Sequence, residues 1–326
     1  MLYDNHGRVI NYVRLAVTDR CNLRCFYCMP ESGIKYINRK DLLTYEEMER
    51  LMRVLSEQGI SKLRITGGEP LIRRGIMDFL HRLSEIDGLK QMHITTNGTF
   101  TKAYIPQFKQ IGLKSVNLSL DSLDKKRFLE ITRRDAFDQV METFHGLLDA
   151  EINTKINMVV MEGRNTQDII PMLELGKKHK VGVRFIEEMP FNGTLGQGNA
   201  TFWPARKILD HIKEVYPDVR KLEDPANSTS LNYQIPGFQG SFGIIAAYTR
   251  TFCGTCNRIR LTPKGELKTC LYDNGSVSLR DVIRSGASDE ELMEVIRSSL
   301  NNRAKDGFEA EKRRAPVHES MATIGG

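Results

Sequence analysis

Residues 12–28 read YVRLAVTDRCNLRCFYC, an apolar β-rich run that leads directly into a loop with three cysteines. The spacing is Cys21-x3-Cys25-x2-Cys28. A cubane iron–sulfur cluster normally takes one cysteine per iron, so three cysteines leave one iron open to a non-protein ligand. Zinc is an alternative, because three cysteines and a histidine form a closed structural site, although this loop contains no histidine. The loop predicts a metal centre or cluster, with chance clustering and redox thiols as the remaining interpretations.

A second cysteine triplet lies near the other end of the chain, where Cys253-x2-Cys256 is followed by Cys270. All six cysteines of the chain fall into these two triplets. Spacing alone leaves a second cluster and a zinc site completed by a histidine equally open here. The chain begins MLYDNHGRVI, which lacks the apolar core of a signal peptide, so we expect a cytoplasmic protein with reduced thiols.

Length and charge narrow the function classes. The chain has 326 residues, with 47 basic and 41 acidic residues and a net charge of +6. This length favours one large domain with a smaller second one. The basic residues are scattered, and the run 312–314 is typical of a solvated surface, so we expect no nucleic-acid binding, whereas an anionic small substrate suits the charge. No apolar run approaches the roughly 20 residues of a membrane helix.

Short β-rich runs alternate with amphipathic segments from residue 12 to about 188. This alternation predicts a parallel sheet with helical crossovers, and periodicity does not decide between an open sheet and a partial barrel. The predicted strands are Tyr12–Val17, Lys62–Thr66, Gln91–Thr95, Ser115–Leu120, Thr154–Val160 and Gly182–Glu187. The predicted helices lie near 44–58, 73–86, 101–111, 124–149 and 166–180.

The pattern changes after residue 190. A Gly/Asn-rich stretch over 191–200 predicts a linker, followed by a helix near 204–215, strands near 231–235, 240–248 and 258–262, and helices near 278–284 and 289–303. We therefore predict two domains, 1–190 and 191–326, the second being a smaller α+β domain that carries the second triplet.

Candidate site motifs follow the predicted strands. Ligands of parallel sheets bind at the carboxyl ends of the strands. Each motif is by itself an ordinary turn sequence, but their common position at one edge predicts one shared pocket. The motifs are the first cysteine loop, Gly67-Gly68-Glu69-Pro70, Thr95-Thr96-Asn97-Gly98, Asp121-Ser122 and Met189-Pro190.

The first cysteine loop, with Tyr27 before its last cysteine, and the Gly67-Gly68-Glu69-Pro70 motif resemble the radical S-adenosylmethionine superfamily. The run from Cys253 to Arg260, with Cys270 and the terminal Gly325-Gly326, is similar to the GTP 3′,8-cyclase family of molybdenum cofactor biosynthesis. The resemblance covers essentially the whole chain. It implies a partial (β/α) barrel of about six parallel strands with a smaller C-terminal domain.

The resemblance implies two [4Fe–4S] clusters, one on Cys21, Cys25 and Cys28 and one on Cys253, Cys256 and Cys270. It further implies that S-adenosylmethionine chelates the open iron of the first cluster and that GTP contacts the second. The implied S-adenosylmethionine contacts are Tyr27, Gly68, Ser119 and Met189, and the implied GTP contacts are Arg14, Arg64, Thr95, Lys155, Arg258, Ile259 and Arg260.

The implied activity is that of a lyase. A 5′-deoxyadenosyl radical would take the ribose 3′ hydrogen of GTP, the resulting C3′ radical would add to guanine C8, and reduction would then give 3′,8-cyclo-7,8-dihydro-GTP. Arg14 would be a hydrogen or proton donor late in the reaction, and Gly325 and Gly326 would reach into the active site, where only residues without side chains fit closely.

The implied partners are an external electron donor and a downstream cyclic pyranopterin synthase that receives the product, with no nucleic acid or membrane; the chain would be a monomer or homodimer. Two alternatives stay open, a radical S-adenosylmethionine enzyme that matures peptides and a non-enzymatic zinc or Fe–S protein.

Overall fold

The computed structural model describes residues 1–189, 203–275, 277–313 and 320–325. The predicted linker over 191–200 and Gly326 lie outside these residues. Within them, no helix is long and apolar enough to cross a bilayer.

The described residues form a twelve-stranded sheet in the order β14-β13-β12-β3-β4-β5-β6-β7-β8-β11-β10-β9. Every neighbouring pair from β12 through β11 is parallel, and the outer strands on both sides are antiparallel. The strands are β3 (Tyr12–Ala16), β4 (Lys62–Thr66), β5 (Gln91–Thr96), β6 (Ser115–Ser119), β7 (Thr154–Val160), β8 (Gly182–Glu187), β9 (Arg220–Lys221), β10 (Ser230–Gln234), β11 (Ser241–Ile245), β12 (Arg258–Leu261), β13 (Glu266–Lys268) and β14 (Val277–Ser278).

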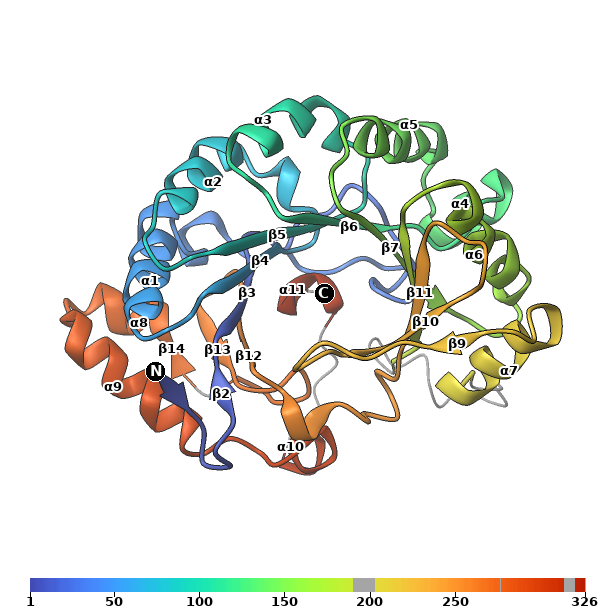
Figure 1. Ribbon diagram of the computed structural model, residues 1–326. Coiled ribbons are helices and arrows are strands. Elements are labelled where there is room, and N and C mark those ends of the chain that lie inside the picture. The colour runs from blue at the N-terminus through green and yellow to red at the C-terminus, as the bar shows by residue number, and fades with distance from the viewer. Residues whose placement is uncertain (190–202, 276, 314–319, 326) are drawn as a thin grey trace.

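The six predicted strands are confirmed as β3 to β8, each to within one residue. The C-terminal region contributes two further parallel strands, since β12 pairs with β3 and β11 pairs with β8. These strands extend the same sheet at both of its edges, so the curved sheet is built from both halves of the chain (Figure 1). The predicted partial barrel is thereby confirmed, while the domain boundary at residue 190 stays a prediction.

Helices cover the convex face of the curved sheet (Figure 1). Capping boxes begin α1 and α9, with Thr44 paired to Glu47 and Ser288 paired to Glu291. The single helix predicted over 124–149 is wrong, because Arg133 ends α4 in the left-handed conformation and α5 starts at Phe137. The helices are α1 (Tyr45–Glu57), α2 (Ile76–Ser84), α3 (Ile105–Gln110), α4 (Lys125–Thr132), α5 (Phe137–Asp149), α6 (Ile169–Lys178), α7 (Ala205–Val215), α8 (Leu279–Arg284), α9 (Asp289–Leu300), α10 (Gly307–Arg313) and α11 (Met321–Ile324).

The two faces of the parallel strands differ in chemistry. In β7, Ile156, Met158 and Val160 are buried in the core, whereas the alternate residues Lys155 and Asn157 line a cavity. The sequences of parallel strands that are covered by helices on both faces are nearly continuous apolar runs. The alternation in this chain indicates that the concave face is lined by polar groups. The short helix α11 lies inside this curve (Figure 1).

A small hairpin of β1 (Leu2–Tyr3) and β2 (Val9–Ile10) precedes the barrel. Leu2 and Ile10 are buried in the core with residues of α9, so the hairpin is packed onto the fold.

Candidate active site

Both cysteine triplets line the same cavity, whose volume is about 670 Å³. Its wall is made by the inward-facing residues of the parallel strands and by the loops at their carboxyl ends. The shared pocket that the motif positions predicted is thus present in the structure.

Glu69 holds the loops around the first cysteine triplet together. Its buried carboxylate accepts hydrogen bonds from Asn97 N at 2.7 Å and from Thr96 Oγ1 at 2.9 Å. Burial raises the pKa of Glu69 to about 7. Asn97 in turn donates through Nδ2 to Asn22 Oδ1 at 3.0 Å and to Cys21 Sγ at 3.6 Å. The motifs after β4 and β5 therefore fix the start of the cysteine loop.

Gly68 lies where two backbones touch. A Cβ at this position would be 2.3 Å from Arg20 O and 2.9 Å from Asp19 O. Gly68 N also donates to Thr18 O at 2.8 Å. The glycine therefore allows the loops after β3 and β4 to approach closely, beside the cavity that Gly68 lines.

Tyr27 connects the cysteine loop, which follows β3, to the loop after β6. Its hydroxyl donates to Asp121 Oδ2 at 2.8 Å, and Asp121 Oδ1 accepts from Val159 N at 2.9 Å. Burial raises the pKa of Asp121 to about 6 and holds that of Tyr27 well above its usual range. The other predicted S-adenosylmethionine contacts, Ser119 and Met189, line the same cavity.

The three thiols of the first triplet are free and partly buried. Burial raises the pKa of Cys21 to about 11 and that of Cys28 to about 12. In the part of the chain that the structure describes, no three His, Cys, Asp or Glu side chains are arranged to hold a single metal ion. A cubane takes one thiolate on each of several irons, so its ligands need not converge on one point. The three thiols of this loop supply ligands of that kind.

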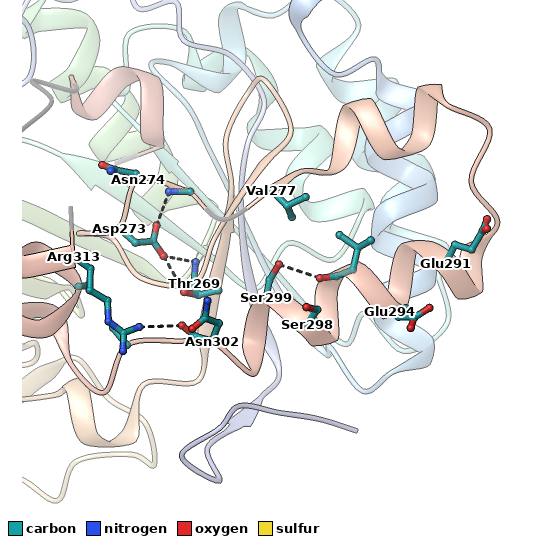
Figure 2. Close-up of a pocket in the computed structure, with 14 residues that line it drawn as sticks. Thr269, Asp273, Asn274, Val277, Glu291, Glu294, Ser298, Ser299, Asn302 and Arg313 are labelled. Carbon is teal, nitrogen blue, oxygen red and sulfur yellow. Dashed lines mark hydrogen bonds between the residues drawn. The ribbon is translucent and has the colours of Figure 1, made fainter. Parts of the chain in front are cut away.

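The second triplet is carried by the loop before β12 and the turn after β13. Asp273 shapes this turn, because its carboxylate accepts from Cys270 N at 2.7 Å and from Thr269 N at 2.8 Å. Figure 2 shows Asp273 and Thr269 at one side of a second pocket, whose other wall is α9. Arg313 in that pocket donates to Asn302 O at 3.1 Å.

Two arginines lie against Cys256. Burial alone would raise the pKa of its thiol, but Arg258 and Arg303 outweigh burial and lower it to about 6. Arg303 donates through Nη2 directly to Cys256 Sγ at 3.1 Å. No motif in the sequence pointed to Arg303.

Cations line the inner face of the sheet on β12, β3 and β4 and again on β7 and β8. The strand register places Arg260 beside Arg14 and Arg14 beside Arg64. The predicted substrate contacts that line the cavity are Arg14, Arg64, Thr95, Lys155, Arg258 and Arg260. The structure adds Lys62 and Arg184, which sequence reasoning missed. They alternate with apolar residues along β4 and β8, a signal that marks inward positions once the sheet is known to curve.

Ile259 is the exception among the predicted contacts. Its side chain is fully buried in the apolar core, because successive residues of a strand face opposite sides. The residues that line the cavity do not include Ile259, and its contact with GTP stays a prediction.

The row of cations is electrostatically unfavourable by itself. Burial, together with the neighbouring Arg258, lowers the pKa of Arg260 to about 10, and burial with Arg184, Arg64 and Lys62 lowers that of Lys155 to about 8. Burial and the charge of Arg260 hold the pKa of Arg14 well below its usual range. An anionic ligand would relieve this repulsion.

Buried oxygens without a partner face the same space. Within residues 1–189, 203–275, 277–313 and 320–325, Thr95 Oγ1, Asn117 Oδ1 and Asn157 Oδ1 have no hydrogen-bond partner. All three residues line the cavity. Because buried polar groups are normally satisfied, this lining fits a polar ligand.

The C-terminal segment runs between the two cysteine sites. Ser320 Oγ donates to Cys28 O at 2.5 Å, and Arg260 Nη1 donates to Gly325 O at 2.8 Å. Gly325 has a φ of +77°, and a Cβ there would lie 2.6 Å from Ala16 Cβ. The structure places this predicted tail residue against a predicted substrate contact.

Comparisons with known proteins agree with this geometry. Residues 15–176 match the Radical SAM superfamily, and residues 181–308 match a family described as Molybdenum Cofactor Synthesis C. SuiB of Streptococcus suis, solved bound to S-adenosylmethionine, has a TM-score of 0.62 at 16% identity, covering 89% of this chain and 68% of that chain. This likeness shows a shared fold.

Sequence relatives are much closer. GTP 3′,8-cyclase of Syntrophomonas wolfei is 42% identical over 90% of this chain and 91% of its own length. The mitochondrial GTP 3′,8-cyclase of Arabidopsis thaliana is 38% identical over 99% and 80%. Molybdenum cofactor biosynthesis protein 1 of Bos taurus is 41% identical over 93% of this chain and 48% of its own length, so the chain spans about half of that relative.

The partial barrel and the cysteine loop after its first strand define a radical S-adenosylmethionine domain, a class that uses S-adenosylmethionine and an iron–sulfur cluster. The match of residues 181–308 and the relatives that align over most of their own length identify one family within this class. The chain belongs to the GTP 3′,8-cyclase family of molybdenum cofactor biosynthesis.

Proposed function

We propose that this chain converts GTP to 3′,8-cyclo-7,8-dihydro-GTP, with a [4Fe–4S] cluster on each cysteine triplet. The observation that carries the proposal is the single cavity lined by both triplets and by the row of cations. One small substrate in this cavity can contact both sites. When bound, the first cluster and S-adenosylmethionine supply a 5′-deoxyadenosyl radical that takes the ribose 3′ hydrogen.

The donor sets suit these groups. Each triplet offers three free thiols and so leaves one iron position for a non-protein ligand. Cys21, Cys25 and Cys28 would hold the cluster that binds S-adenosylmethionine. Tyr27, Gly68, Ser119 and Met189 line the cavity where that cofactor would lie.

The cations of the barrel bind and orient the substrate in this account. Arg64, Lys155 and Arg184 lie on inward positions of β4, β7 and β8, and guanidinium groups match phosphate oxygens through two parallel hydrogen bonds. Arg258 and Arg260 lie on β12, which follows Cys256, so they suit the guanine end. Positioning of the ribose between the two sites is the main contribution of the protein.

The C-terminal segment would close the cavity around the substrate. Arg260 already donates to Gly325 O, and Gly325 packs on Ala16 of β3. We infer that the segment fixes Arg260 and helps to exclude water from the reacting ribose. Four points stay predictions: the late donation of a hydrogen or a proton by Arg14, the external electron donor, the transfer of product to a cyclic pyranopterin synthase, and the cytoplasmic location.

Nucleotide binding by the anaerobically reconstituted protein tests the assignment of the cavity. We expect calorimetry to show that GTP binds far more tightly than guanosine and that Arg64→Gln weakens GTP binding by about tenfold or more. Arg127→Gln is a matched control, since Arg127 pairs with Asp168 outside the cavity lining. Equal GTP affinity in all three proteins would contradict the proposal, and a peptide-maturing enzyme would not bind GTP.

A further inference from the structure

Arg303 is a buried arginine that no motif explains and that lies beside the second cysteine triplet. It follows the last turn of α9, and its side chain is 3% exposed. A buried guanidinium is costly unless it is paired and hydrogen-bonded. The partners of Arg303 therefore indicate what it does.

The guanidinium of Arg303 is directed at the backbone and sulfur of the second triplet. Nη2 donates to Cys256 Sγ at 3.1 Å and to Arg258 O at 3.0 Å. Nη1 donates to Cys256 O at 3.2 Å and to Asp4 Oδ2 at 3.1 Å. One side chain thus spans the residues from Cys256 to Arg258 and holds one thiol by a direct hydrogen bond.

Asp4 belongs to the N-terminal hairpin and fixes Arg303 in this orientation. Its side chain is fully buried, and its Oδ2 also accepts from Arg8 Nε at 2.6 Å. Arg8 Nη1 donates to Cys253 O at 3.0 Å and to Lys305 O at 2.7 Å. The hairpin and residues 303–305 together enclose the first two cysteines of the triplet.

We propose that Arg303, held by Asp4, is a positioning residue that sets the reduction potential of a cluster on Cys253, Cys256 and Cys270. This inference rests on the proposed second cluster. Reduction adds negative charge to a cluster and its thiolates. A charged donor on a ligand sulfur stabilises that extra charge, so it makes the potential less negative. The same contact fixes the position of Cys256 relative to Arg258.

The test isolates the second cluster in a parent protein that carries Cys21→Ala, Cys25→Ala and Cys28→Ala. Potentiometric titration followed by electron paramagnetic resonance gives the midpoint potential, and iron and sulfide analysis gives cluster content. We expect Arg303→Gln to shift the midpoint to more negative potential and Arg303→Lys, which keeps a cation but not the planar fork, to fall between Gln and the parent.

Arg127→Gln in the same parent is the control, since it removes a more exposed arginine–carboxylate pair away from the cysteines. Its midpoint potential should equal that of the parent. A midpoint in Arg303→Gln equal to the parent, at equal iron content, would overturn the inference. If Arg303→Gln retains no iron, the same comparison is made with Arg303→Lys. A midpoint potential of Arg303→Lys equal to that of the parent would then overturn the inference.

The two proposals fail differently. A parent protein that binds no iron and sulfide refutes the second cluster and with it the role of Arg303. If the parent holds a full cluster and its midpoint potential does not change when Arg303 is replaced, only the inference about Arg303 is refuted.

Discussion

Single residues of the cavity show how the fold prepares for an anion. Lys155 lies among Arg184, Arg64 and Lys62, and burial together with these charges lowers its pKa to about 8. His93, on β5, has its pKa lowered to about 3, by burial first and then by Arg64, Lys62, Lys155 and Lys114. The site keeps like charges close together at a cost that a polyphosphate would offset.

We predict that GTP affinity depends on pH through Lys155. The ammonium form binds phosphate, and its pKa of about 8 means that it is mostly charged at pH 7. Affinity should therefore fall as pH rises above about 8, by up to about tenfold per pH unit for one proton. Calorimetry at pH 7 and pH 9 measures this decline, and Lys155→Gln should bind more weakly at pH 7 with a smaller decline.

Tyr12 needs a matched control, because its pKa is also about 8: burial opposes its ionisation, but Arg64 and Arg14 outweigh burial. The pH comparison of the parent protein with Lys155→Gln is therefore repeated with Tyr12→Phe added to each. An unchanged pH dependence after loss of Lys155 would count against its role.

Gly243 gives a second prediction at the same scale. A Cβ there would lie 2.0 Å from Ser230 Oγ and 2.6 Å from Arg184 Nη1, so the missing side chain makes room for the guanidinium. Gly243→Ala should displace Arg184 and weaken GTP binding by on the order of tenfold while cluster content stays the same. Gly176→Ala, where a Cβ meets nothing closer than 3.5 Å, is the control. Equal affinity in both variants would show that Arg184 does not contact the substrate.

Among the elements, the positions of the strands were more predictable than the side chains that the strands direct into the cavity. Residue types and turn signals located β3 to β8, because short apolar runs bounded by turns define strands. The inward row of Lys62, Arg64 and Arg184 was only partly recognised, since a polar alternation in a parallel strand has meaning only once the sheet curves into a barrel. The break between α4 and α5 depends on the left-handed backbone of Arg133. The residue type alone does not predict this conformation.

The C-terminal segment is the element whose role is easiest to test. We predict that deletion of Gly325 and Gly326 abolishes cyclisation, because the hydrogen bond from Arg260 to Gly325 O is lost. Cluster content should be unchanged, because the described part of the tail meets the first cysteine loop through Ser320, which the deletion leaves in place. Product analysis and iron content measure both effects, and turnover equal to the parent would refute this role for the tail.

At the scale of the whole molecule, strands from both halves of the chain complete one curved sheet. The sequence placed the second triplet in a separate region, and spacing left zinc and cluster equally open there. The pairing of β12 with β3 brings that triplet to the cavity of the first. Such contacts between distant segments cannot be read from local patterns. Arg303 and the hairpin at Asp4 were missed for the same reason, since they meet Cys256 only in the folded chain.

Metal content is the corresponding prediction for the whole chain. Two cubanes require about eight irons and eight labile sulfides per chain after anaerobic reconstitution. Replacement of Cys253, Cys256 and Cys270 by alanine should halve both values and leave the first cluster intact. Zinc without sulfide in the second site would refute the two-cluster account and favour a structural zinc site.

Turnover of GTP deuterated at the ribose 3′ carbon tests the central claim most directly. The reconstituted protein is given dithionite, S-adenosylmethionine and labelled GTP without oxygen, and the products are analysed by mass spectrometry. The account predicts that deuterium moves into 5′-deoxyadenosine and that a cyclised guanine nucleotide forms. Unlabelled 5′-deoxyadenosine, produced at the same rate without GTP and with no nucleotide product, would contradict it.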